Sequence, residues 1–194
     1  MKKLLALSAV TFILAAAGKA QITPASLKDE IKIDNKVESN IKKEKKDDRK
    51  EVRMLDGKEV SYQSKQAFFA DFGNVPVSKW ERTDTYDKAD FTKNGQLMTA
   101  YYDADAELVG TTSNKTFGDI PASAQKYIDK KYPDYIKSDV VFFKDNELNE
   151  TGMILFGDQF DDADNYFVEL KKDNKDIVLQ VSMSGDISFF KQIQ

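Results

Sequence analysis

The sequence predicts an α+β fold: two units, each a helix followed by a β-meander, share one antiparallel sheet with the helices packed on one face. Two segments, 64–72 and 120–131, have apolar residues at helical spacing, and each is followed by short strand-like segments. Asn94-Gly95 is a strong signal for a two-residue hairpin turn. Residues 89–109 and 166–190 both follow the order strand, polar turn, strand, turn and strand. The two halves therefore look like two copies of one unit.

The first unit is predicted to begin with a helix over 64–72. Phe68, Phe69 and Phe72 form its apolar side, and Gly73-Asn74 ends it. Strands are predicted over 77–83, 86–92, 97–102 and 107–111, with the hairpin turn after 92 and another turn at 103–105.

The second unit has the clearer helix signal. Ile120, Ala124, Tyr127, Ile128 and Lys131 lie on one helical face. Pro121 suits the first helical turn, and Tyr132-Pro133 ends the helix. Strands are predicted over 136–143, 152–156, 166–170, 177–183 and 187–190. Residues 166–170 and 177–183 alternate as half-buried strands do.

Residues 1–20 have the three parts of a secretory signal peptide. Lys2 and Lys3 precede an apolar run over 4–17, and the small residues Gly18 and Ala20 predict cleavage before Gln21. As a helix the apolar run would span about 21 Å at ~1.5 Å per residue, which is short for a bilayer core of about 30 Å. The alternative is an uncleaved anchor. We therefore expect a periplasmic or secreted protein with no membrane span after signal removal.

Residues 21–56 are predicted to be a charged, disordered tether ahead of a folded domain at 57–194. In 27–56, 19 of 30 residues are charged, and Gly, Pro and aromatic residues are absent. Such a segment cannot bury enough apolar surface to fold alone. The alternative is a functional basic arm, because four lysines lie within 42–46, but Glu44, Asp47 and Asp48 neutralise them.

Composition excludes several mechanisms. The chain has neither Cys nor His, which rules out Ser-His-Asp and Cys-His nucleophiles and the usual zinc ligands, so we expect no cofactor. Residues 57–194 hold 16 basic and 24 acidic side chains, a net charge of −8. This charge disfavours nucleic acid and anionic lipid as partners.

The order of these elements resembles the PepSY-like, beta-lactamase-inhibitor-like proteins exported by Gram-negative bacteria. The residues that carry the likeness are FFADFGNVPVSKWERTDTYDKADFTKNGQLMTAYYDADAEL (68–108) and DIPASAQKYIDKKYP (119–133). The resemblance implies a helix pair on a curved antiparallel sheet. It also implies a protein that binds or inhibits other exported proteins, notably peptidases and beta-lactamases. The family pattern usually places Gly in the turn where Ala106 stands here.

The acidic segment 157–165 is the candidate for a metal site. Asp158, Asp161, Asp162 and Asp164 could supply oxygen ligands to calcium, but the Gly and Glu of the usual calcium loop are missing. A solvated hairpin loop explains the same residues. With 33 acidic residues in the chain, a carboxylate pair for glycoside hydrolysis could arise by chance.

Five aromatic residues are the candidates for contacts with a partner, because Trp and Tyr are enriched in binding hot spots: Tyr62, Trp80, Tyr86, Tyr101 and Tyr102. If 97–102 is a strand, Tyr101 and Tyr102 point to opposite faces, one to the core and one outward. We therefore expect a non-catalytic binding or inhibitory module that contacts another exported protein through the sheet face away from the helices. The alternatives are a calcium- or ligand-sensing protein that uses 157–165 and a small carboxylate-dependent hydrolase.

Overall fold

The computed structural model describes residues 52–160, 163–173 and 175–193. The predicted signal peptide and residues 21–51 of the predicted tether lie outside these ranges.

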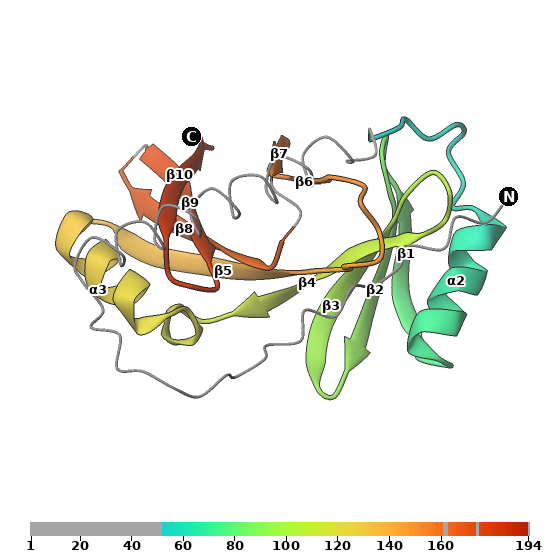
Figure 1. Cartoon of the computed structure of the whole chain (residues 1–194), viewed down its shortest axis with the longest axis horizontal. Coiled ribbons are helices and arrows are strands. Elements are labelled where there is room, and N and C mark those ends of the chain that lie inside the picture. The colour runs from blue at the N-terminus through green and yellow to red at the C-terminus, as the bar shows by residue number, and fades with distance from the viewer. Residues whose placement is uncertain (1–51, 161–162, 174, 194) are drawn as a thin grey trace, which may run out of the picture. The chain divides into compact units, whose positions relative to one another are not determined.

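An eight-stranded antiparallel sheet forms the domain (Figure 1), in the order β1-β2-β3-β4-β5-β8-β9-β10. Because β6 and β7 pair only with each other among the described strands, they form a separate hairpin between β5 and β8 in the chain. The strands are β1 (Val77–Arg82), β2 (Asp87–Lys93), β3 (Gln96–Tyr102), β4 (Leu108–Lys115), β5 (Ile136–Asp145), β6 (Met153–Leu155), β7 (Asp158–Phe160), β8 (Asn165–Lys172), β9 (Lys175–Ser182) and β10 (Ile187–Gln192).

The two α-helices, α2 (Tyr62–Phe72) and α3 (Ala122–Lys131), occur where the sequence predicts them, and a 3₁₀ turn, η1 (Phe117–Asp119), precedes α3. The Ser61 side chain caps α2 by accepting a hydrogen bond from the Ser64 amide. Gly73 ends this helix at a φ of 76°, a conformation that favours glycine.

Both helices pack on the same face of the sheet, as predicted. Phe68 of α2 packs with buried residues of β2 and β3, including Ala100. Ile128 of α3 packs with Val140, Val168 and other residues of β5, β8 and β9. Residues that pair across neighbouring strands point to the same face of the sheet. The pairings from β3 through β4 to β5 therefore place Ala100 and Val140 on the same face.

Two predicted core positions on the helices are wrong. Phe69 is 62% exposed and Tyr127 is 45% exposed, whereas their neighbours Phe68 and Ile128 are buried. Consecutive helical residues differ by about 100° around the axis, so only one of each pair can point at the sheet. The Tyr127 hydroxyl instead accepts a hydrogen bond from Lys131.

The β6–β7 hairpin covers the opposite face of the C-terminal half of the sheet. Met153 and Phe160 of the hairpin pack with Phe143, Phe167 and Val178. As a result the middle of β8 and β9 is buried on both faces, and the prediction of half-buried strands there is wrong. The prediction of a loop over 157–165 also missed β7.

The folded domain already includes Val52, ahead of the predicted start at 57. Val52 packs against the cluster under the β6–β7 hairpin. The Leu55 amide donates to the Asp84 carbonyl at 2.7 Å, and the Asp56 carbonyl accepts from Arg82 at 2.6 Å. These contacts attach the last five residues of the predicted tether to the domain.

Candidate functional site

The face of β1 to β4 that points away from α2 is the candidate contact surface, which we call the open face. The strand pairings place one set of alternating residues on it. Its members that have side chains are all polar except Leu97, which is 54% exposed, and all at least partly exposed except Thr112, which is 8% exposed. They are Lys79, Glu81, Lys88, Asp90, Thr92, Leu97, Thr99, Tyr101, Thr112 and Asn114.

Charged groups on the open face are paired across the strands. Glu81 of β1 lies between Lys79 and Lys88, and its carboxylate is 3.8 Å from the Lys88 ammonium. The hydrogen bond from Lys79 and the charge of Lys88 lower the pKa of Glu81. Thr99 donates to Asp90 at 2.7 Å. Such a surface can form directional polar contacts with a protein partner.

Tyr101 is the one predicted contact residue that the structure places on the open face. Its ring stands edge-on to Tyr86, with 5.9 Å between centroids, and its hydroxyl lies 3.2 Å from the Thr112 hydroxyl. Burial against these neighbours raises the pKa of Tyr101. Tyr102 points the other way, fully buried under α2, and its hydroxyl donates to Asp71. The prediction that these two tyrosines point to opposite faces is therefore confirmed.

The other predicted contact residues lie elsewhere. Tyr86 is 3% exposed, its hydroxyl donates to the Gly152 carbonyl at 2.8 Å, and burial raises its pKa to about 12. Trp80 packs edge-on against Phe68 on the helix face. Tyr62 is 70% exposed on α2. Burial thus removes Tyr86 and Tyr102 from any partner contact, and Tyr62 and Trp80 do not share a surface with Tyr101.

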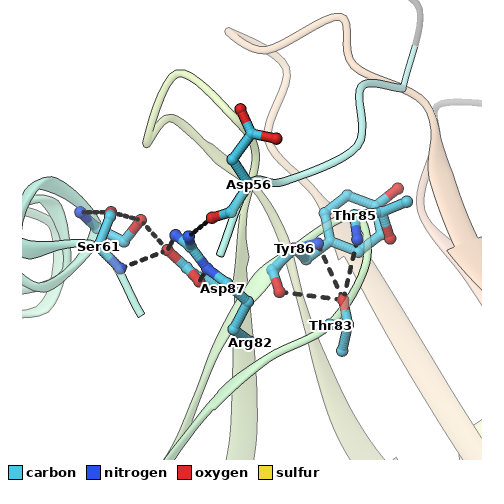
Figure 2. A network of polar contacts seen from close by, with 8 residues as sticks. Asp56, Ser61, Arg82, Thr83, Thr85, Tyr86 and Asp87 are labelled. Carbon is cyan, nitrogen blue, oxygen red and sulfur yellow. Dashed lines mark hydrogen bonds and ion pairs between the residues drawn. The ribbon is translucent and has the colours of Figure 1, made fainter. Parts of the chain in front are cut away.

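A buried ion pair holds the start of α2 against β1 and β2 (Figure 2). The Arg82 guanidinium donates two hydrogen bonds to the Asp87 carboxylate, each at 2.7 Å, and the Ser61 amide and Ser64 hydroxyl donate to the same carboxylate. Burial opposes ionisation of Asp87, but these hydrogen bonds and the Arg82 charge outweigh it and lower the Asp87 pKa. The sequence contains no recognisable signal for this network, because its members meet only after β1 and β2 pair.

A second buried carboxylate, Asp103, joins the β3–β4 turn to the segment before β6. It accepts hydrogen bonds from the amides of Asp105 and Glu107 within the turn. It also accepts from the Asn149 side chain at 3.1 Å and from the Thr151 hydroxyl at 2.9 Å. Asp87 and Asp103, the two buried carboxylates of the described residues, therefore both serve the fold.

The acidic segment 157–165 is tied to its surroundings at the two candidate ligands that the structure describes. Asp158 pairs with Lys191 at 3.2 Å, and Asp164 accepts a hydrogen bond from the Asp145 amide at 2.8 Å. Asp161 and Asp162 lie outside the described residues. Within the described part of the chain, no group of three or more His, Cys, Asp or Glu side chains could hold a metal ion.

No helix in the described ranges is long and apolar enough to cross a membrane.

Comparison with known proteins finds likeness in structure alone. No protein-family model matches the sequence, and neither does any curated protein. A BLIP-like protein from Bacteroides fragilis is 20% identical, with a TM-score of 0.54 over 70% of this chain and 87% of its own. A DUF2874 family protein from Bacteroides uniformis is 14% identical, with a TM-score of 0.57 over 70% of this chain and 91% of its own.

A third solved structure, from Bacteroides eggerthii, is provisionally described as periplasmic. It is 15% identical, with a TM-score of 0.57 over 70% of this chain and 90% of its own. At these identities the likeness shows the fold. The predicted α+β class is confirmed, and the resemblance to beta-lactamase-inhibitor-like proteins holds at the level of architecture.

Proposed function

We propose that this chain is an exported, non-catalytic module that binds another exported protein through its open face. Export is supported by the signal-peptide pattern of residues 1–20 and by the provisional description of one structural neighbour as periplasmic. A binding role is supported by the fold shared with a BLIP-like protein. The absence of Cys and His from the chain favours binding over nucleophilic catalysis.

The unequal covering of β1 to β4 carries the proposal. One face of these strands packs under α2 in an aromatic cluster around Phe68 and Phe91. The open face instead carries an ordered row of charged and hydroxyl side chains with the aromatic Tyr101 among them. An aromatic anchor within a polar rim is the usual composition of a protein contact surface.

Position-specific crosslinking in the exporting cell tests the proposal. A photoreactive amino acid at Thr99 lies on the open face and is expected to give one discrete adduct with a partner protein. The matched control places the same amino acid at Lys126, which is exposed on α3. The proposal fails if Thr99 gives no adduct or if both positions give the same adducts.

Enzyme assays test the inhibitory form of the proposal separately. The purified protein is titrated into a beta-lactamase with a chromogenic cephalosporin and into secreted peptidases with casein. Inhibition that Thr99→Arg abolishes and Lys126→Ala preserves would support the open face as the inhibitory surface. Inhibition that persists unchanged in Thr99→Arg would contradict it.

A further inference from the structure

The turn between β5 and β6 presents a leucine to solvent at its tip. The Asn149 amide donates to the Asn146 carbonyl at 2.8 Å, which closes a tight turn with Glu147 and Leu148 at its centre. Leu148 is 93% exposed, more than any other large apolar side chain of the described residues. Because so little of it is buried, this side chain adds almost no apolar burial to the fold.

The backbone beneath Leu148 is fixed by buried polar contacts. The Asn146 side chain donates to the Leu108 carbonyl at 2.7 Å. Asn149 is 2% exposed, its side chain donates to the Asp103 carboxylate at 3.1 Å, and its carbonyl oxygen accepts from the Thr151 amide at 2.8 Å. A turn already held in one shape loses less conformational entropy on binding than a flexible loop does.

The surroundings of Leu148 are strongly acidic. Glu147 and Glu150 are exposed, and neither forms an ion pair with another described residue. The ranges 103–107 and 145–150, which the Asp103–Asn149 contact joins, hold six acidic residues and no basic one. Such a concentration of one charge attracts a basic surface and disfavours an acidic one.

The same turn adjoins the open face at Tyr101. The Tyr101 ring stands edge-on to Tyr86, and the Tyr86 hydroxyl donates at 2.8 Å to the carbonyl of Gly152, two residues after Glu150. A partner seated over Tyr101 is therefore within reach of the turn. The turn adds to the open face what that face mostly lacks, a protruding apolar side chain.

We infer that Leu148 enters an apolar pocket, rimmed by lysine or arginine, on the exported protein that the open face binds. The inference rests on the proposed function and gives the partner its chemistry. An apolar side chain at the centre of a contact, with charged side chains around it, is the arrangement expected of a protein interface. Glu147 and Glu150 supply that charged surround and choose a basic partner over an acidic one.

Crosslinking from the tip of the turn tests the contact. A photoreactive amino acid at position 148 is expected to give an adduct with the same protein as position 99. Mass spectrometry should place the joined residue of that protein among apolar residues next to lysine or arginine. The matched control is position 183, because Met183 is also an apolar residue exposed at a turn, at 52%, and it should give no adduct.

The outcomes at the two positions separate this inference from the proposed function. An adduct at 99 without one at 148 overturns the inference and leaves the proposed function standing. An adduct at 148 without one at 99 refutes the open face and keeps the turn as a contact. The absence of an adduct at both positions refutes both.

Binding of the protein captured at position 99 measures the two parts of the contact. Leu148→Ala is expected to weaken binding about tenfold, because a buried leucine loses most of its apolar contact, and Met183→Ala should leave it unchanged. Glu147→Gln should slow association and reduce its dependence on salt. The charge-matched control is Asp139→Asn, since Asp139 is exposed on β5 about 20 Å along the strand from Asp145. Unchanged binding in Leu148→Ala, or equal effects of the two charge variants, overturns the inference.

Discussion

The two halves of the sheet contain similar elements but bury them differently. In β2, under α2, burial alternates, so that Asp87, Ala89 and Phe91 are buried between half-exposed neighbours. In β8, which lies between β5 and β9 under α3, the adjacent residues Phe167 and Val168 are both buried. The β6–β7 hairpin causes the difference, because it covers the second face of the C-terminal half and reaches the N-terminal half only near Tyr86, Tyr101 and Val109. One short hairpin thus makes this face part of the core in the C-terminal half, whereas the open face of the N-terminal half keeps its polar side chains.

The largest effect should come from removing a side chain beneath the hairpin. Phe167→Ala is expected to lower the free energy of unfolding by about 3–5 kcal/mol, because the ring is 1% exposed and packs against Phe160 and Phe190. Lys88→Ala, on the open face of the other half, should change it by less than about 0.5 kcal/mol. Urea denaturation measures both. Similar losses of the free energy of unfolding in the two variants would show that the open face is covered as fully as the face beneath the hairpin.

The helix-covered face of the C-terminal half gives the next largest effect. Ile128→Ala empties a fully buried site among Val140, Val168 and Leu179, and should cost about 2–5 kcal/mol. Lys126→Ala, on the exposed side of α3, should stay within about 0.5 kcal/mol. Thermal unfolding of the two variants checks the orientation of α3, and a larger loss in Lys126→Ala would contradict it.

The buried ion pair of the N-terminal half should make stability depend on pH. The folded-state pKa of Asp87 is lowered, so its contribution is complete above the unfolded pKa of about 3.9 and is lost as pH falls through the folded value. Asp87→Asn should cost roughly 1–3 kcal/mol at neutral pH, because it removes charged hydrogen bonds. The difference in the free energy of unfolding between wild type and Asp87→Asn should become smaller below about pH 4. Denaturation curves across this range measure it, and a constant difference would show that Asp87 does not ionise as described.

The smallest effect compares one tight turn from each half. Asn94-Gly95 and Phe156-Gly157 both adopt positive φ, 53° and 77° in the first turn and 52° and 82° in the second. Asn tolerates this region, whereas a bulky side chain there costs about 1–2 kcal/mol. Phe156→Asn should therefore stabilise the protein, by up to about 1 kcal/mol after the loss of ring contacts with Phe167 and Phe190.

The reverse substitution supplies the control for this turn. Asn94→Phe should destabilise the protein by about 1 kcal/mol, because it adds the strain without a buried contact. Calorimetry at one pH resolves both shifts. A Phe156→Asn variant that is clearly less stable than wild type would mean that the ring contacts matter more than the backbone strain.

Local sequence determined the features that depend on neighbouring residues alone. The spacing of Ile120, Ala124 and Ile128 predicted α3 and its buried side, and Asn94-Gly95 predicted the β2–β3 turn. The period of two in a strand predicted that Tyr101 and Tyr102 diverge. The family pattern usually has Gly in the turn where Ala106 stands, and Ala106 has a φ of 60°. This backbone conformation favours glycine, so the Gly of the family pattern has a conformational reason.

Only the tertiary structure decided which of these surfaces became core. Tyr102 is buried and Tyr101 half-exposed because α2 lies on one face of β3, and nothing within 97–102 specifies that side. Phe167 and Val178 are buried by the separate β6–β7 hairpin, and Asp87 meets Arg82 and Ser64 only when β1, β2 and α2 assemble. Burial is a property of the whole packing arrangement, so local periodicity can define the faces of each element but cannot specify what covers them.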